Sequence, residues 1–496
     1  MSAAPRDTPL RGTGRRWAAL YVLCGGMLMI VLDVTIVNVA LPSIQDELHF
    51  TSAALAWVVN AYLIAFGGLL LLAGRLGDLV GRRRVFLAGI AVFTVASLVC
   101  GIANGQALLV GARFVQGVGG AMTSAVILGM IVTMFPEPRE QARAIGVYAF
   151  VASAGGSVGL LAGGLITQAI DWHWIFFVNV PIGIATAVLA RRMLDPDAGI
   201  GLDRGADVPG GVLITAALMV GVYAIVGPAA SHGWGDWRTL AVGAVSLGLL
   251  AAFVARESSA TNPLMPLRIL RSRPVVAANT IQILSVAGMF GMFFLGALYL
   301  RRVLGYDALQ IGLSFLPVTL AMGTLSIRYS ERIVTRFGAR AALVTGMPLI
   351  MAGLAWFAHA GVHGSYGGDV LPSMLLLGIG AGVAFPALMN VAMTGATPED
   401  AGLASGLVNT TAQVGGALGL AVLATLSEAR SRALKGAGES TLAALTGGYH
   451  LAFWIATALV GCALLVAIFA LPARRRARAG TEEHVGAPSP EAAAGS

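Results

Sequence analysis

The chain has 496 residues, of which 57% are hydrophobic and only 11% are charged, against about 25% charged in an ordinary soluble domain. Such a chain has too few polar residues to cover itself in water, which excludes a soluble globular protein. The formal net charge of +8 does not require a nucleic-acid partner, because the positions of the basic residues follow from membrane topology.

Apolar runs recur along nearly the whole chain, and each is long enough to cross a hydrocarbon core of about 30 Å as a helix. The predicted helices are residues 17–39, 54–74, 84–103, 107–134, 141–165, 174–193, 208–228, 238–255, 275–300, 310–328, 340–359, 370–393, 402–426 and 449–471. The first run follows arginines, as in a signal peptide, but its length and the helices after it predict a retained span. We therefore predict an all-α polytopic membrane protein with fourteen transmembrane helices.

The basic residues predict the orientation of these helices, because cytoplasmic loops hold most Lys and Arg. With the N-terminus in the cytoplasm, most of the 32 Lys and Arg residues fall inside, and Arg113 falls within a helix. The basic residues left outside are Arg238, Arg301, Arg302, Arg430, Arg432 and Lys435. We expect both termini in the cytoplasm and the protein in the cell membrane.

The sequence also repeats internally. Residues 74–89 align with 331–346 when Gly81 is set on Gly338, and the fifth predicted helix aligns on the thirteenth at a nearly equal offset. This predicts two homologous six-helix halves arranged as parallel repeats, as in secondary transporters. The expected domains are a cytoplasmic tail (1–16), an N-terminal bundle (17–195), two inserted helices (196–258), a C-terminal bundle (259–473) and a disordered cytoplasmic tail (474–496).

One carboxylate stands in the middle of the first predicted helix. A charge near the bilayer centre costs about 2.5 to 3.5 kcal/mol, so Asp33 must have a compensating role. It is the only acidic residue deep in a predicted span, since Asp207 and Glu428 lie at helix ends, and Arg113 is the only basic one. A buried carboxylate near a cation can titrate close to neutral pH, which favours proton coupling. The alternatives are a permanent structural pair, or an Arg113 that bonds only carbonyl groups.

Three motifs resemble those of the major facilitator superfamily. Residues 74–84, GRLGDLVGRRR, resemble its signature loop between the second and third helices, although Leu79 replaces a usual basic residue. Residues 113–117, RFVQG, resemble its fourth-helix signature. The third motif has the spacing of its fifth-helix antiporter signature and consists of Gly146, Gly155, Gly159, Gly163 and Gly164. Leu160 stands where that signature usually has a proline.

Further segments resemble the fourteen-helix drug:proton antiporter family of that superfamily in particular. These are LDVTIVNVALP (32–42), WHWIFFVNVP (172–181), in which His173 stands where Arg is common, and GLASGLVNTTAQVGGALGLAV (402–422). The resemblance covers residues 17–471. It implies the major facilitator fold and proton-driven export of small, often amphipathic compounds, with the proton as coupling ion and no cofactor.

The resemblance also implies roles for particular residues. Asp33 and Arg113 would form the proton-coupling site. The loop would switch between conformations through Gly74, Asp78, Gly81, Arg82 and Arg83. In that loop, Asp78 can accept backbone N–H bonds at a helix start and pair with arginine, which would hold one conformation.

The glycines of the fifth helix recur at four-residue spacing, which lets helix backbones approach closely. Packing alone explains this spacing, but the repeat predicts that the fifth and thirteenth helices face each other between the halves. The substrate would occupy an inward-facing cavity at the midplane, for which the candidate residues are Asn38, Gln116, Asn409, Thr410 and Gln413.

We predict a monomeric efflux transporter that uses the proton motive force to export small hydrophobic, neutral or monocationic molecules such as drugs and antibiotics. Proton symport, or export of a metabolite or lipid on the same fold, is the alternative. An enzyme is not expected, because no nucleophile, metal or acid/base cluster is recognisable. A sensor without flux would usually carry a signalling domain, whereas the end of the chain is short and polar.

Overall fold

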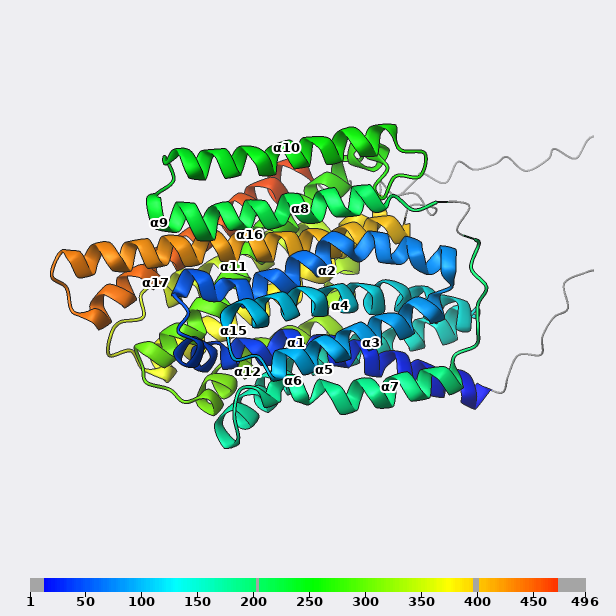
Figure 1. The fold of residues 1–496 in the computed structure, drawn as a ribbon, viewed down its shortest axis with the longest axis horizontal. Helices are drawn as coiled ribbons and strands as arrows, with labels where there is room; N and C mark the ends of the chain where they lie inside the picture. Colours follow the sequence, from blue (N-terminus) through cyan, green and yellow to red (C-terminus); the bar gives the residue numbers. More distant parts are fainter. Residues whose placement is uncertain (1–12, 202–204, 396–400, 472–496) are drawn as a thin grey trace, which may run out of the picture.

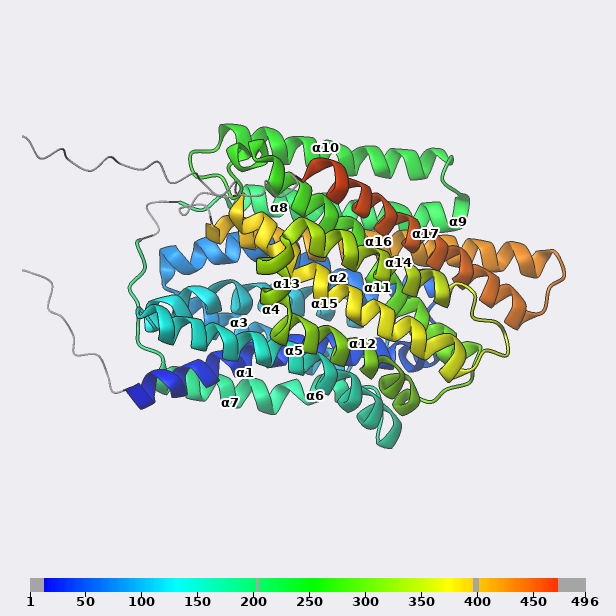
Figure 2. The same ribbon diagram turned by 180° about the vertical axis from the view of Figure 1, so that it is seen from behind.

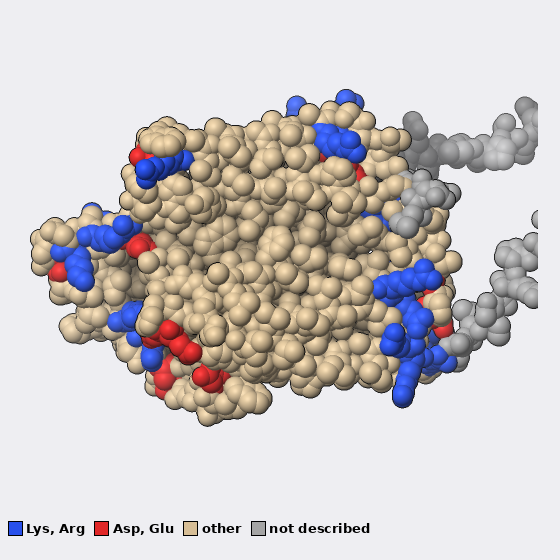
Figure 3. Space-filling model, viewed as in Figure 1, with Lys and Arg blue, Asp and Glu red and all other residues tan. Residues whose placement is uncertain are grey.

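The structure, a computed structural model, describes residues 13–201, 205–395 and 401–471. Fourteen helices within these residues are long and apolar enough to cross a membrane, as predicted, and the described residues form no strand. Figures 1 and 2 show the helices running side by side along the long axis of the molecule. On the face in Figure 3, charged residues gather at the two ends and leave an uncharged band between them. This band is the part that the bilayer surrounds.

The N-terminal half contains six spans. Its helices are α1 (Thr13–Leu48), α2 (Ser52–Val80), α3 (Arg82–Gly101), α4 (Gln106–Met134), α5 (Pro138–Ala169), α6 (Trp174–Phe177) and α7 (Asn179–Met193). The short α6 and α7 together make the sixth span. Helix α4 packs along α2 and α3, while α1 packs along α5 and α7. This arrangement places the middle of α1 next to the middle of α4.

The inserted pair lies along one edge of the bundle (Figure 1). It consists of α8 (Val208–Ala224), a π-helical turn η2 (Ile225–Ala229), α9 (Ala230–His232) and α10 (Trp237–Ser259). Helix α8 packs on α2 and α10, while η2 and α9 reach α16 (Ala401–Gly436). Helix α10 is the least buried of the fourteen spans, so most of its surface faces lipid.

The C-terminal half contains the remaining six spans. Its elements are η3 (Leu267–Arg271), α11 (Arg273–Arg302), α12 (Ala308–Arg328), α13 (Ser330–Phe337), α14 (Ala339–Phe357), η4 (Tyr366–Val370), α15 (Leu371–Thr394), α16 and α17 (Thr441–Ala470). Helix α15 packs on α12 and α14, and α11 packs on α16 and α17.

Two local features recur in both halves at the positions that the repeat predicts. Gly81 and Gly338 each end a helix with positive φ, at 109° and 89°, where only glycine is unstrained. Two residues later, Arg83 and Arg340 each donate a hydrogen bond of 2.7 Å to a main-chain carbonyl of the last helix of their own half. The halves therefore share internal contacts as well as sequence.

Some helices extend beyond their predicted ends. The first was expected to end at residue 39 and the thirteenth at 426, but α1 continues to Leu48 and α16 to Gly436. Hydropathy marks the part of a helix inside hydrocarbon, and polar residues continue the helix beyond it. At the other terminus α1 begins at Thr13, within the residues expected to form the cytoplasmic tail, and the predicted tail 474–496 lies outside the described residues.

The two halves meet along two seams, α2 with α16 and α5 with α12. The prediction that the fifth and thirteenth helices, α5 and α16, face each other is therefore wrong. Helix α5 packs instead on α12, and α16, the repeat equivalent of α5, packs on α2. This is the pairing that a two-fold relation between the halves produces.

Several polar contacts between the halves lie at the end of the molecule opposite residue 13, here called the far end. Arg302 forms an ion pair with Asp46. The Ala53 N–H donates to Glu428 Oε2 at 2.6 Å, and the Leu309 N–H donates to the side chain of Gln168 at 3.2 Å. These contacts hold the halves together at the far end in this conformation.

Candidate functional site

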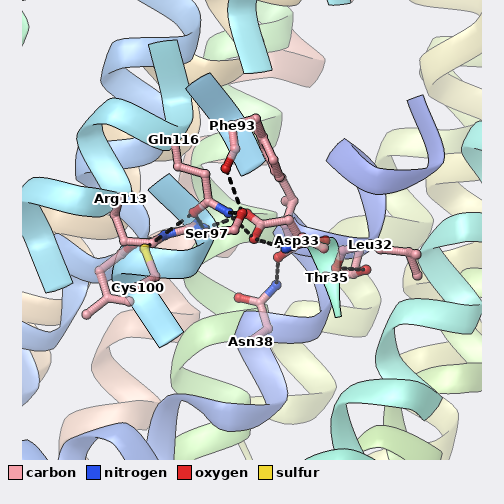
Figure 4. A network of polar contacts seen from close by, with 12 residues as sticks. Leu32, Asp33, Thr35, Asn38, Phe93, Ser97, Cys100, Arg113 and Gln116 are labelled. Atoms are coloured by element: carbon pink, nitrogen blue, oxygen red, sulfur yellow. Dashed lines mark hydrogen bonds and ion pairs between the residues drawn. The ribbon is translucent and has the colours of Figure 1, made fainter. Parts of the chain in front are cut away.

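Asp33 and Arg113 form an ion pair inside the N-terminal half. Asp33 on α1 is 0% exposed and Arg113 on α4 is 1% exposed. Arg113 Nη1 donates to Asp33 Oδ2 at 2.5 Å. Both side chains lie among the helices of this half (Figure 4), and their burial shields the pair from bulk water. The two charges depend on each other, because removing either partner would leave an uncompensated charge in the protein interior.

Gln116 completes this pair. It follows Arg113 by three residues and so lies on the same face of α4. Its carbonyl oxygen accepts from Arg113 at 2.6 Å, and its amide nitrogen donates to Asp33 Oδ1 at 2.6 Å and to Ser97 Oγ at 2.8 Å. Figure 4 shows Gln116 reaching toward both Ser97 and Asp33. The structure therefore places Gln116, expected at the substrate cavity, inside the buried network.

Other helices contribute to the same network. Asn179, at the start of α7, donates to Asp33 Oδ1 at 3.1 Å. Arg113 Nε donates to the Val58 carbonyl of α2 at 2.9 Å, and its guanidinium lies 4.5 Å from the ring centre of Tyr62. Arg113 thus bonds both the carboxylate and a carbonyl group, so the alternative in which it bonds only carbonyl groups is wrong.

Three polar side chains in this half are buried and have atoms without a hydrogen-bond partner. They are the amide of Asn60, the hydroxyl of Tyr62 and the carbonyl oxygen of Asn179. Buried polar groups normally have partners, and internal water commonly supplies them. Since Tyr62 and Asn179 both contact the ion pair, these groups mark where water can approach Asp33.

The switch loop, residues 74–84, is held by two aspartates. Asp78 accepts from Arg82 at 3.0 and 3.2 Å, which is the expected pairing with arginine. The helix start, however, is capped by Asp197, whose carboxylate accepts from the backbone N–H groups of Arg82 and Arg83. The capping role predicted for Asp78 thus belongs to a residue in the connection after α7, which sequence distance concealed.

The two loop glycines differ in their surroundings. Gly81 has positive φ, and a methyl group added to it would lie 2.6 Å from the Asp197 carbonyl. The same addition at Gly74 would meet only Ala125, at 3.9 Å. The structure therefore requires glycine at Gly81, whereas Gly74 has room for a side chain.

The glycines of α5 separate into contacting and open positions. A methyl group on Gly155 would lie 3.1 Å from Leu28 of α1, and one on Gly163 would lie 2.8 Å from the Ile36 carbonyl. Gly164 faces the other half, where the Ala308 carbonyl would be 2.7 Å away. Gly146 has no neighbour within 4 Å. Most of this signature therefore brings α5 close to α1 and α12.

The remaining cavity candidates lie on α1 and α16. Asn38 is half-buried and donates to the Val34 carbonyl at 3.0 Å, while Asn409 is exposed. The hydroxyl of Thr410 is buried without a partner, and the Gln413 side chain lies close to Gly67 across the α2–α16 seam. The last two residues therefore lie where the halves meet.

Two large cavities open at the end that holds residue 13. One of about 1040 Å³ is bordered by Arg15, Asp78 and Asp197. The other, of about 900 Å³, is bordered by Gly338, Arg340 and Asn390. They occupy equivalent places in the two halves, whereas the predicted substrate cavity was at the midplane.

A polar cluster at the far end brings ligand atoms of Glu47, Asp171 and His173 within 4.8 Å of one another. His173 Nδ1 and Asp171 Oδ1 are 2.5 Å apart, and the Trp172 N–H donates to Glu47 at 2.7 Å. Burial opposes ionisation of Asp171, but the hydrogen bonds from His173 prevail and lower its pKa. These bonds join the three residues at the far end.

Comparison with known proteins places the chain among membrane transporters. Residues 23–420 match the Major Facilitator Superfamily. The chain is 37% identical to a puromycin resistance protein of Streptomyces alboniger, over 92% of this chain and 91% of that protein. It is 37% identical to a cephamycin export protein of Amycolatopsis lactamdurans, over 94% of each. A lincomycin resistance protein of Streptomyces lincolnensis is 34% identical, over 92% and 91%.

Solved structures share the fold at low identity. A bacterial homologue of the human lysosomal transporter Spinster, in an inward-facing and unoccupied conformation, has a TM-score of 0.65 and 14% identity, and the match covers 92% of this chain and 97% of that one. The human organic anion transporter MFSD10 has a TM-score of 0.60 and 14% identity, with 91% and 99% covered.

Proposed function

Because the chain belongs to the Major Facilitator Superfamily, we propose that it is a proton-coupled efflux transporter of small hydrophobic molecules. The family is the one predicted from the motifs, and the multi-pass location in the cell membrane is the one predicted from the apolar runs and the basic residues. Relatives that align over more than nine-tenths of the chain are named for antibiotic resistance or export. Antibiotics are therefore the first compounds to test as substrates. We also propose that the protein acts as a monomer.

The observation that supports proton coupling is the buried Asp33–Arg113 pair. Asp33 is 0% exposed, and ionisable groups inside a membrane protein commonly serve proton or substrate movement. Both Asp33 oxygens accept hydrogen bonds from Arg113, Gln116 and Asn179. Protonation of Asp33 would weaken its bond to Arg113 and so change the relative stability of the two transport conformations.

The same geometry separates proton and substrate. Asp33 is fully buried and bonded through both oxygens, so a substrate does not reach it in this conformation. The proton would therefore act through the conformational equilibrium, because a ligand shifts that equilibrium only by its differential affinity for the two states. The substrate would bind between the halves, where Asn38, Asn409, Thr410 and Gln413 are the candidate contacts.

The proposed orientation places residue 13 in the cytoplasm, as the distribution of basic residues predicts. The far end, where Asp46 pairs with Arg302, then faces outward and is closed. This conformation would accept substrate from the cytoplasm, and the exporting step would separate the contacts at the far end.

Everted membrane vesicles test this proposal. Respiration acidifies their interior, so an antiporter should dissipate the pH gradient when an exported antibiotic such as puromycin is added. A pH gradient that stays unchanged across a panel of antibiotics would contradict proton-coupled efflux. Acidification that increases on addition would indicate symport instead. Vesicles from cells without the protein provide the baseline.

A further inference from the structure

Two carboxylates meet between the inserted helices, far from Asp33 in the sequence. Asp207 directly precedes α8, and Glu257 lies in the last turn of α10, so both are at the end of the molecule that holds residue 13. Each residue is only 3% exposed. In the sequence, Asp207 stands at a helix end, where charged residues are common, and nothing singles out Glu257.

The hydrogen bonds of the pair leave one oxygen without a partner. Asp207 Oδ1 accepts from the Gly210 N–H at 3.2 Å and from Arg256 Nε at 3.0 Å. The Glu257 oxygens accept from the Leu264 N–H at 3.4 Å and the Met265 N–H at 2.8 Å. Asp207 Oδ2 is buried and accepts no hydrogen bond from any described residue.

The unpartnered oxygen faces the second carboxylate. A methyl group added to Gly210 would lie 2.5 Å from Asp207 Oδ2 and 3.0 Å from Glu257 Oε1, so both oxygens border the same small space. The cation beside them is Arg256, whose side chain is 46% exposed. From α2, Arg75 donates to the Gly205 carbonyl at 3.4 Å. Among the described residues, Arg256 is thus the cation that forms an ion pair with this site, and it is half-exposed while both carboxylates are buried.

Two ionised carboxylates in this place would be costly for two reasons. A buried carboxylate oxygen without a donor loses its hydration and gains nothing in return. Like charges at close range also disfavour the ionisation of both groups, and such pairs commonly share one proton. A proton on either carboxyl group reduces this cost, because the pair then holds one negative charge instead of two.

We propose that Asp207 and Glu257 together bind one proton and form a second proton site, separate from the Asp33 network and built by the inserted helices. Binding forms a single O–H bond and releases nothing, so no co-reactant is needed. Loss of the proton leaves two repelling charges where the connection before α8 meets α2 through Arg75. The proton occupancy of the pair therefore affects the contact between the inserted helices and the helix that leads into the switch loop.

Infrared spectroscopy of the purified full-length protein tests the site without depending on transport. A protonated carboxyl group has a C=O stretching band that an ionised carboxylate lacks. The difference spectrum between wild type and Glu257→Gln at neutral pH should contain this band, and the band should titrate away as pH rises. Glu257→Gln keeps the shape of the side chain, and its amide can donate to Asp207, so the fold should persist. Asp207→Asn should remove the same band.

The control is Glu428→Gln, which changes a carboxylate at the far end and should leave the band intact. Absence of the band from the difference spectrum would overturn the proposal, because the pair would then be ionised on both sides. A band that appears only after chelation with EDTA would also overturn it, since a metal cation would then occupy the pair. Neither outcome bears on efflux through Asp33, so the two proposals fail independently.

Discussion

Gly159 lies directly against Thr35, and a methyl group added to the glycine would be 1.9 Å from the threonine hydroxyl. That hydroxyl is fixed, because it donates to the Val31 and Leu32 carbonyls of its own helix at 2.8 and 3.1 Å. The contact sets how closely α5 approaches α1, two residues from Asp33.

We expect Gly159→Ala to destabilise the protein by about 1 to 3 kcal/mol, as overpacking of a tight contact does. Gly146→Ala is the matched control on the same helix, since no neighbour lies within 4 Å of Gly146. Thermal unfolding in detergent measures both variants. Adding Thr35→Ala to Gly159→Ala should restore part of the loss, and equal unfolding temperatures for the two single variants would contradict the contact.

Asp33→Asn should abolish proton-coupled efflux. It should also destabilise the protein, by up to about 3 to 5 kcal/mol, because Arg113 is left buried without its anion. The double variant Asp33→Asn with Arg113→Gln removes both charges and should recover stability but not coupling. Unfolding temperature and collapse of the pH gradient in everted vesicles separate the two effects. Proton-coupled efflux by the double variant would show that the coupling site lies elsewhere.

The two aspartates of the switch loop should have different effects. Asp197→Ala removes the acceptor for two N–H groups at the start of α3 and should cost about 0.5 to 2 kcal/mol of stability. Asp78→Asn loses only a half-exposed ion pair, worth about 1 kcal/mol or less, but should slow turnover without changing substrate affinity. Binding and transport assays on Asp78→Asn test this, and weaker binding at normal turnover would be inconsistent with a switch.

Reversing one charge at the far end should open it. Arg302→Asp would place two carboxylates together where Arg302 and Asp46 now pair, and Asp46→Arg added to it should restore the attraction. Because the pair is partly exposed, the restored interaction should be worth about 1 kcal/mol or less. Alkylation of Leu309→Cys in an otherwise cysteine-free chain reports opening. Equal labelling of the single and double variants would exclude this pair as a far-end contact.

Substrate charge should matter because Asp33, the carboxylate of the proposed coupling site, is already bonded to Arg113. The candidate substrate contacts Asn38, Asn409, Thr410 and Gln413 are uncharged as well, so no spare negative charge offsets a dication, whose transfer from water is costly. Cells expressing the protein should be protected against mono-quaternary ammonium compounds and much less against matched bis-quaternary ones. Protection that is equal or stronger against the bis compounds would mean that Glu428 or another carboxylate enters the substrate site.

Hydropathy and charge patterns predicted the architecture well because each transmembrane helix must satisfy its own backbone hydrogen bonds and present apolar side chains to lipid. Asp33 and Arg113 could be paired from the sequence, since they are the only acidic and the only basic residue deep in a predicted span. Gln116 was placed in the wrong environment, although its spacing of three residues from Arg113 was a usable signal.

The other partners could not be read from the sequence. Ser97 and Asn179 are ordinary polar residues that become functional candidates only when α3 and α7 bring them to Asp33. The cap provided by Asp197 and the meeting of Asp207 with Glu257 both depend on how connections fold back between helices. Tertiary contacts of this kind leave no local pattern in the chain.

The inserted helices separate one of the two seams from the bilayer but leave the other seam uncovered. Helix α8 covers α2, and Arg432 of α16 donates to the Ala230 carbonyl of α9 at 2.6 Å, so the α2–α16 seam lies behind protein. Beside the other seam, Phe150 of α5 and Leu320 of α12 are 59% and 56% exposed. The inserted helices therefore cover one seam and leave the other without a protein cover, so a hydrophobic molecule dissolved in the membrane can approach the halves' contact more closely at α5 and α12 than at α2 and α16.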